Sequence, residues 1–273
     1  MRGMFTCGVL DVFMENSIRF DGAAGISAGA TFGCNYKSHQ PGRAVRYNMR
    51  YSRDPRYCSL RSLIKTGDLY GADFCYRAIP DELDPFDYEA FKTDPMEFYV
   101  GATDVRTGKP VYHLCKDVGE TDMLWIRASA SMPVVSRVVK VDGYELLDGG
   151  ITDSVPFEYM ESLGYDRNVI VLTQPEGYLK KKSSLSGLIR MFLGRYPKAA
   201  EAMENRYLMY NDQMRRIEER RKSGVSLVIR PPKALGIKRT EKDPKELERV
   251  YRIGREEGNR RLPEVRAFLE AGL

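Results

Sequence analysis

The sequence predicts an α/β fold in which a mostly parallel central sheet has helices on both faces. The first observation is the pentapeptide Gly25-Ile-Ser-Ala-Gly29, which follows a short apolar run and precedes a helical pattern, as a strand, a tight turn and a helix would. The second is the near-continuous apolar run at 168–173, which is typical of a strand buried on both faces of a parallel sheet. Predicted strands and helices alternate along the chain, which favours a doubly wound sheet.

The remaining elements follow from local patterns. We expect helices at 7–17 and 28–38, and an irregular segment at 54–95 that covers the site. The later elements are a strand at 97–104, a helix at 123–130, a hairpin at 138–148 that turns at Asp142 and Gly143, a helix at 197–222, a strand at 225–230, and two helices within 243–269 that break near Gly258. Residues 1–175 are predicted to form a catalytic core, and residues 176–273 a helical C-terminal extension with one strand that completes and caps it.

Composition narrows the class of protein. At 273 residues and 42% hydrophobic content, the chain can bury a full core. It shows no signal-peptide pattern and no apolar run of about 18 residues, so we expect a cytoplasmic protein without a membrane-spanning segment. A net charge of +5 without a dense basic motif argues against nucleic-acid binding. Five scattered cysteines suit reduced thiols, and two distant histidines argue against a metal site, so no metal or cofactor is expected.

Ser27 lies at the apex of the predicted turn, where a nucleophile elbow holds a reactive serine. A side chain at Gly25 or Gly29 is expected to collide with the neighbouring strand or helix as the chain reverses. The helix that begins at Ala28 points its N–H groups and the positive end of its dipole at the serine. The simpler interpretation is an ordinary strand-to-helix turn built of small residues.

The sequence argues against a histidine base for Ser27. His39 would lie roughly 18 Å along the following helix, at about 1.5 Å per residue. His113 lies in a predicted hairpin strand, where a structural role is the simpler interpretation. The best candidate base is Asp148, which ends a predicted strand and precedes two glycines that let backbone approach closely. Taken alone, an aspartate before two glycines is more often a turn former.

Three motifs in order resemble the patatin-like phospholipases. They are the pentapeptide around Ser27, the small-residue segment 128–133 with its proline, and Asp148 followed by Gly149 and Gly150. The resemblance runs through residue 175 and is closest to a bacterial branch of the family. It implies a three-layer α/β/α patatin-like fold and a Ser-Asp dyad without histidine. Under this resemblance Ser27 is the nucleophile, Asp148 is the general base, and the two glycines support the dyad.

The start of the chain resembles only the end of the family's glycine-rich oxyanion loop. Under the resemblance, Arg2 and Gly3 belong to that loop, and N–H groups near Gly3 and Ala28 hold the oxyanion beside the elbow glycines. The leading glycines and the strand before them are missing, so we expect an open edge on the strand that precedes Ser27. A start codon placed too late, a shortened chain and a degenerate member each account for this difference.

The resemblance implies hydrolysis of phospholipids or other lipid esters through an acyl-enzyme, without a cofactor. The alternative is a catalytically weak or inactive member that binds lipid or protein after losing part of the oxyanion loop. A thioesterase or acyltransferase that uses the same elbow is a third hypothesis.

A basic and apolar segment follows the predicted core. Lys180, Lys181 and Lys182 precede apolar residues at helical spacing, namely Leu185, Leu188, Ile189, Phe192 and Leu193. Such a segment favours peripheral contact with the anionic inner face of a membrane. The simpler interpretation is a packed helix beside a solvated run of lysines.

Overall fold

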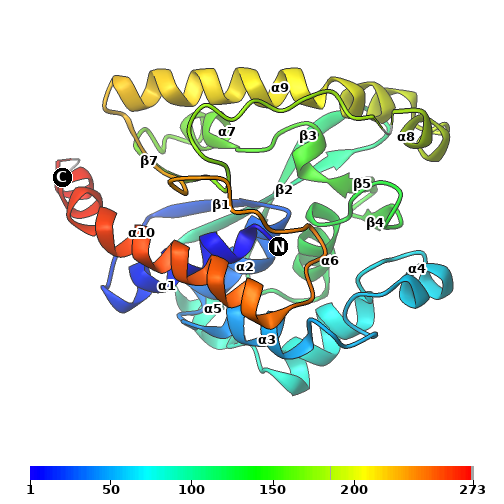
Figure 1. Ribbon diagram of the computed structural model, residues 1–273, viewed down its shortest axis with the longest axis horizontal. Coiled ribbons are helices and arrows are strands. Elements are labelled where there is room, and N and C mark those ends of the chain that lie inside the picture. The colour runs from blue at the N-terminus through cyan, green and yellow to red at the C-terminus, as the bar shows by residue number, and fades with distance from the viewer. Residues whose placement is uncertain (185, 272–273) are drawn as a thin grey trace.

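The computed structural model describes residues 1–184 and 186–271 and has an α/β architecture (Figure 1). Its elements in chain order are α1 (Gly3–Glu15), β1 (Gly22–Ile26), α2 (Ala28–Lys37), α3 (Arg43–Tyr51), α4 (Leu60–Thr66), the π-helix η1 (Phe74–Leu83), α5 (Tyr88–Thr93), β2 (Glu97–Asp104), β3 (Lys109–Cys115), α6 (Glu120–Ser129), β4 (Val139–Val141), β5 (Tyr144–Asp148), the 3₁₀-helix η2 (Gly149–Ile151), α7 (Phe157–Ser162), β6 (Asn168–Val171), α8 (Ser186–Phe192), α9 (Pro197–Lys222), β7 (Ser226–Ile229) and α10 (Pro244–Glu270).

The sheet that carries the site is built around β2. Strand β1 pairs with β2 in parallel, from Gly22 opposite Glu97 to Ile26 opposite Gly101. Strands β3 and β5 pair with β2 in the antiparallel sense, and β4 pairs antiparallel with β5. Strands β6 and β7 form a separate parallel pair. The α/β class is therefore confirmed, but the expectation of a mostly parallel sheet is wrong, because the main sheet is mixed.

Two short connections account for two of the three antiparallel pairs, β2 with β3 and β4 with β5. Residues 105–108 join β2 to β3, and Asp142 and Gly143 join β4 to β5. Connections this short return the chain antiparallel, because a parallel crossover needs a dozen or more residues. Asp142 and Gly143 have φ of +49° and +77°, as a two-residue hairpin turn requires, so the hairpin predicted at 138–148 is confirmed. Among the described strands, β1 pairs with β2 alone.

Helices cover both faces of the strands, which gives three layers (Figure 1). Ile170 of β6 and Val228 of β7 pack with Phe157 of α7 and Ile217 of α9 on one face. The residues next to Ile170 and Val228 along each strand point to the opposite face. They belong to the main core, which also contains side chains of α1, α2 and α10. Alternate residues of a strand face opposite sides, so the apolar run at 168–173 packs against a core on both faces, with Ile170 buried and Val169 and Val171 partly buried.

The C-terminal helix α10 is continuous, so the expected break near Gly258 is wrong. The glycines of α10 serve close packing against α1 instead. A Cβ at Gly254 would lie 2.0 Å from the Phe5 carbonyl oxygen, and one at Gly258 would lie 3.2 Å from the Val12 Cβ. Pro263 also lies inside α10 without ending it. Long-range packing on α1 therefore outweighs the local tendency of glycine and proline to interrupt a helix.

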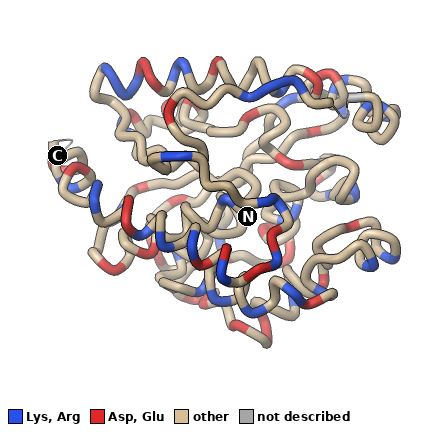
Figure 2. Tube along the Cα trace, viewed as in Figure 1, with Lys and Arg blue, Asp and Glu red and all other residues tan. Residues whose placement is uncertain are grey.

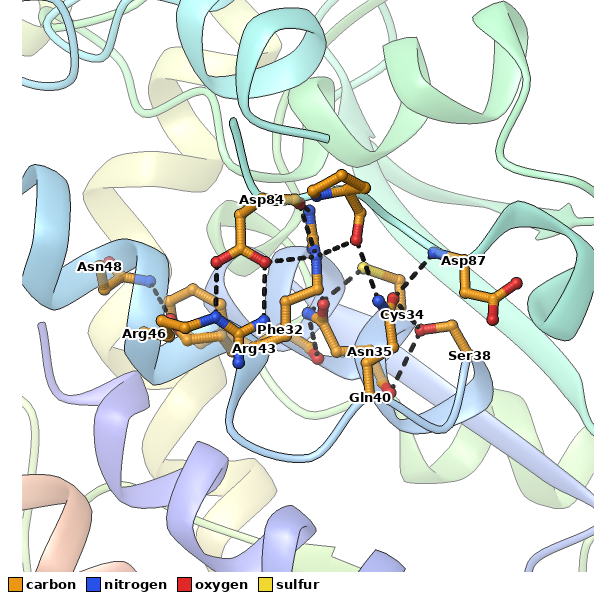
Figure 3. Close-up of polar contacts among 12 residues, drawn as sticks. Phe32, Cys34, Asn35, Ser38, Gln40, Arg43, Arg46, Asn48, Asp84 and Asp87 are labelled. Atoms are coloured by element: carbon orange, nitrogen blue, oxygen red, sulfur yellow. Dashed lines mark hydrogen bonds and ion pairs between the residues drawn. The ribbon is translucent and has the colours of Figure 1, made fainter. Parts of the chain in front are cut away.

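The segment 54–95 contains helices α4, η1 and α5, so the expectation of irregular structure there is wrong. Ser59 and Asp87 cap α4 and α5 by accepting hydrogen bonds from backbone N–H groups. Serine and aspartate are also common in turns, so the sequence alone did not distinguish these caps from turn residues. Figure 3 shows how the segment is fastened to the helices after the elbow: the Arg46 guanidinium donates two 2.7 Å hydrogen bonds to the Asp84 carboxylate. Buried Arg43 donates to the Asp84 carbonyl oxygen and, at 2.8 Å, to Asn35 Oδ1 of α2.

In the described part of the chain, no helix combines the length and the apolar character needed to cross a membrane. All five cysteines, Cys7, Cys34, Cys58, Cys75 and Cys115, are free thiols.

Candidate functional site

Ser27 lies between β1 and α2 in a strained backbone conformation. Its φ is +56° and its ψ is −114°, an arrangement that residues other than glycine rarely adopt. Gly25 makes the turn sterically feasible, because a Cβ there would lie 2.5 Å from the carbonyl carbon and oxygen of Gly29. The expected collision at Gly29 itself is wrong, because a Cβ at Gly29 would meet no atom within 4 Å. The chain reverses so that residue 25 faces the backbone of residue 29, and only the first glycine is crowded.

Asp148 meets Ser27 directly. It ends β5, where it pairs with Ala102 of β2, and this register brings it to the end of the sheet at which β1 delivers the serine. Ser27 Oγ donates a 2.7 Å hydrogen bond to Asp148 Oδ2, and the Gly150 N–H donates at 2.8 Å to Asp148 Oδ1. Asp148 is only 4% exposed. Burial raises the pKa of its carboxyl group, against the opposing effects of the Arg206 charge and of the hydrogen bonds from Ser27 and Gly150.

The small-residue segment 128–133, which includes the end of α6, holds both partners in place. The Ser27 N–H donates a 2.8 Å hydrogen bond to Ser129 Oγ, and that hydroxyl donates at 2.6 Å to the Gly101 carbonyl oxygen of β2. The Asp148 N–H donates at 2.7 Å to the Ser131 carbonyl oxygen. The sequence motif 128–133 included Ser129, but its pattern predicted no role for this residue. Its fully buried hydroxyl links the elbow to the central strand.

Of the two glycines after Asp148, Gly149 is crowded by backbone and Gly150 by side chains. A Cβ at Gly149 would lie 2.3 Å from the Gly101 carbonyl oxygen. A Cβ at Gly150 would lie 2.9 Å from Arg206 Nη2 and 3.0 Å from Asp148 Oδ1. Arg206 of α9 also donates a hydrogen bond from Nε to the Gly150 carbonyl oxygen. Helix α9 thus contacts the loop that carries the carboxylate, a contact that local sequence patterns do not reveal.

Two helix N-termini converge beside the serine. Helix α2 begins at Ala28, directly after Ser27, and α1 begins at Gly3. A Cβ at Gly3 would lie 2.8 Å from the Ala28 Cβ, so the two helix starts touch. Among residues 1–184 and 186–271, the N–H groups of Gly3 and Ala28 have no hydrogen-bond acceptor. First-turn N–H groups have no partner inside their own helix and favour anions.

Neither histidine reaches this site. His39 Nε2 lies 2.6 Å from Asp94 Oδ2, and His113 Nε2 lies 2.6 Å from Asp122 Oδ1. His113 also stacks on Trp125 with ring centroids 4.9 Å apart. Both side chains are engaged outside the cavity that holds Ser27.

A large cavity opens above the serine. Its volume is about 1420 Å³, beyond the range of roughly 300–1,000 Å³ that is typical of small-molecule sites. Ser27 and Asp148 lie in its wall together with many apolar side chains, among them Phe32, Ile126 and Met203. Part of the segment 54–95, which was expected to cover the site, also lines the cavity.

One cluster outside this cavity has ligand atoms close enough for a metal. His113, Cys115 and Asp122 offer atoms within 4.8 Å of one another. The Asp122 carboxylate already faces His113 and accepts hydrogen bonds from the N–H groups of 116–118. Those contacts give the cluster a structural role, because they fix the first turn of α6 to β3 and to the loop before the helix.

The segment between β6 and α8 carries a run of basic residues (Figure 2). Lys181 and Lys182 are exposed, whereas Lys180 is half-buried; Lys180 and Lys181 both border the cavity. Ile189 of α8 and Leu193, directly after the helix, are buried, whereas other apolar side chains of α8 are exposed. The exposed ones are Leu188, Met191 and Phe192. The predicted apolar position Leu185 lies outside the described residues.

Comparison with known proteins places the chain in a family. The family model described as patatin-like phospholipase matches residues 1–160, and a domain of unknown function (DUF6363) matches residues 196–270. The uncharacterized protein YjjU of Escherichia coli (strain K12) is 32% identical over 178 residues, 64% of this chain and 49% of that protein. The uncharacterized NTE family protein Rv1063c of Mycobacterium tuberculosis (strain ATCC 25618 / H37Rv) is 30% identical over 173 residues, 62% of this chain and 45% of that protein.

The chain thus spans about half the length of these curated relatives. The family match covers more than half of the present chain and includes the elbow, Asp148 and the segment between them. Together with the fold and the geometry around Ser27, this match shows that the chain belongs to the patatin-like phospholipase family.

Proposed function

We propose that this protein is a serine acyl-ester hydrolase that cleaves phospholipids or other lipid esters through Ser27 and Asp148. Membership of the patatin-like phospholipase family indicates lipid acyl hydrolase chemistry in general. The observation that supports the specific assignment most directly is the 2.7 Å hydrogen bond from Ser27 Oγ to a buried Asp148 carboxylate. A serine needs an adjacent base to become a nucleophile, and this carboxylate is within proton-transfer distance.

In the first half of the reaction, Asp148 takes the Ser27 hydroxyl proton as Oγ attacks the ester carbonyl carbon. The carbonyl oxygen becomes an oxyanion, which the N–H groups of Gly3 and Ala28 hold at the two helix starts, with Arg2 beside them in the cavity wall. The tetrahedral intermediate then collapses. The ester C–O bond breaks, the alcohol leaves with the proton from Asp148, and the acyl group stays on Ser27.

In the second half, Asp148 takes a proton from a water molecule as that water attacks the acyl-serine carbonyl. Collapse of the new intermediate breaks the bond to Ser27 Oγ, which recovers its proton from Asp148, and releases the fatty acid. The raised pKa of Asp148 makes its carboxylate a stronger base than an exposed aspartate, because burial penalises the charged form. The apolar wall and size of the cavity suit an acyl chain.

Turnover of a short-chain ester by wild type and by Ser27→Ala tests this proposal. We expect hydrolysis by wild type and loss of at least about 10³-fold in kcat for Ser27→Ala, with an unchanged fold by circular dichroism. Equal slow rates for both proteins would favour a weak or inactive binding member. Ester formation with an added alcohol, in place of fatty-acid release, would favour acyl transfer.

We further propose that α8 contacts a membrane surface. Its exposed Met191 (74%) and Phe192 (41%) suit the interface, and the exposed basic side chains of Lys181 and Lys182 would face anionic lipid headgroups. Sedimentation with vesicles that contain anionic lipid should fall several-fold in Met191→Glu. Arg252→Gln on α10 serves as a charge-change control. Equal sedimentation of Met191→Glu and wild type would contradict this contact.

A further inference from the structure

Four cations gather at the wall of the cavity that holds Ser27 and Asp148. They are Arg2, Lys180, Arg206 and Arg239, and they come from four separate segments of the chain. Among the described residues, none of the four forms an ion pair with a carboxylate. Most other arginines of the described residues do form such pairs, for example Arg215 and Arg220 of α9. The four cations therefore concentrate positive charge where the protein itself supplies little negative charge.

The contacts of Arg206 and Lys180 show that they are held in place. Arg206 donates from Nε to the Gly150 carbonyl oxygen, which leaves its two terminal nitrogens for another acceptor. The backbone of Lys180 is bound to Asn211 of α9 by two hydrogen bonds. Its N–H donates at 2.8 Å to Asn211 Oδ1, and its carbonyl oxygen accepts at 3.0 Å from Asn211 Nδ2. Its ammonium lies 4.3 Å from the centre of the Tyr210 ring. These contacts turn Lys180 inward while its two lysine neighbours stay exposed.

Arg2 and Arg239 complete the group. Arg2 directly precedes α1, and Arg239 lies in the segment between β7 and α10. The Met1 nitrogen lies 2.9 Å from the Arg239 carbonyl oxygen, so these two segments are adjacent. Burial and then the charges of Arg206, Arg2 and Arg239 lower the pKa of Lys180 to about 7, and Asp148 alone among the named charges opposes them. A dianion placed among these groups would relieve their mutual repulsion.

Given the proposed hydrolase function, we propose that Arg2, Lys180, Arg206 and Arg239 form an anion subsite that binds a phosphate group beside the ester to be cleaved. Guanidinium groups bind phosphate oxygens in a bidentate manner, and a lysine adds a point charge. The subsite adjoins the loop of Asp148, so a phosphate bound there lies next to the reacting ester. Either the phosphodiester of a phospholipid or a free inorganic phosphate could supply this chemistry. The experiment has one arm for the anion and one for the lipid.

The first arm measures sulfate binding by calorimetry at constant ionic strength, because sulfate keeps its charge between pH 6 and 8.5. We expect saturable binding that weakens at least about tenfold in Lys180→Gln and in Arg239→Gln. The matched controls Lys222→Gln and Lys238→Gln remove exposed charges from α9 and from the segment that carries Arg239, and they should bind as wild type does. Non-saturable binding, or equal binding by all four variants, would overturn the subsite.

The pH dependence of this binding adds a second readout. Lys180 faces Arg206 of α9, Arg2, Arg239 and Asp148, and its lowered pKa leaves it partly neutral above pH 7 in the unbound protein. Sulfate prefers the protonated form, so wild-type affinity should fall as the pH rises from 6 to 8.5. This fall should shrink in Lys180→Gln. The same slope in both proteins would remove Lys180 from the subsite.

The second arm compares two esters with the same short acyl chains, a phosphatidyl ester and a neutral diacylglycerol. If the subsite binds a lipid phosphate, the ratio of their kcat/KM values should fall at least about tenfold in Lys180→Gln and Arg239→Gln, relative to wild type and the two controls. An unchanged ratio together with specific sulfate binding would assign the subsite to a free phosphate. Specific sulfate binding without hydrolysis of either ester would refute the proposed function and leave the anion subsite intact.

Discussion

Replacement of Ser129 by alanine should weaken both the fold and the activity. The Ser129 hydroxyl accepts the Ser27 N–H at 2.8 Å and donates to the Gly101 carbonyl oxygen at 2.6 Å, with no exposure to solvent. Alanine leaves these two groups without their partner. An unsatisfied buried polar group costs about 1–3 kcal/mol, so we expect the free energy of unfolding to fall by about 2–4 kcal/mol.

The effect on catalysis follows from the strain at Ser27. Its φ of +56° persists only where surrounding contacts enforce it, and the bond to Ser129 is one such contact. A displacement of the nucleophile by about 1 Å can cost about a hundredfold in rate, so kcat should fall by about 10- to 100-fold. Urea unfolding and ester hydrolysis measure the two effects.

The matched control is Ser52→Ala. Ser52 is as deeply buried, but its hydroxyl donates only to the Met49 carbonyl oxygen of its own helix, outside the cavity. We expect a loss of about 1 kcal/mol or less and unchanged kcat for this variant. If Ser129→Ala behaves like Ser52→Ala in both measurements, Ser129 does not hold the elbow and the reasoning is refuted.

Three further predictions concern the elbow and its carboxylate. Gly25→Ala should lower the free energy of unfolding by about 1–3 kcal/mol or more through overlap with the Gly29 backbone, whereas Gly29→Ala should raise it by about 0.5–1 kcal/mol, both measured by urea unfolding. Because the pKa of Asp148 is raised in the folded protein, ionisation of its carboxyl group lowers the free energy of unfolding as pH rises above about 4. Asp148→Asn should therefore have a melting temperature no lower than that of wild type at pH 7. The difference between the two melting temperatures should shrink toward pH 4. The wild-type rate should fall on the acid side with an apparent pKa above that of an exposed aspartate, and a midpoint at or below about 4 in a pH–rate profile would contradict this assignment.

Local sequence patterns were sufficient to predict the elbow and the hairpin that ends at Asp148. Both depend on residues close together in the chain: Gly25 permits the turn at Ser27, and Asp142 and Gly143 set the turn between β4 and β5. The pairing of Ser27 with Asp148 followed from the family resemblance, because no local rule joins residues so far apart. The predicted boundary at residue 175 stays a prediction.

Features that depend on tertiary contacts were not predictable in this way. The antiparallel pairing of β5 with β2 joins strands that lie far apart in the chain, and apolar patterns do not specify it. Gly254 and Gly258 resemble helix breakers until α1 is placed against them. The roles of Ser129 and Arg206 depend on contacts with the elbow and with Gly150, respectively, from distant parts of the chain. A buried polar side chain with two tertiary partners leaves no local signal.

The most direct test of the central claim, that Asp148 activates Ser27 without a histidine, is the rate of labelling by a fluorophosphonate, with the adduct located by peptide mass spectrometry. The account predicts a single adduct at Ser27 and labelling slowed at least about a hundredfold in Asp148→Asn. The double variant His39→Ala, His113→Ala should be labelled at close to the wild-type rate. An adduct at another residue, an unchanged rate in Asp148→Asn, or loss of labelling in the double histidine variant would contradict it.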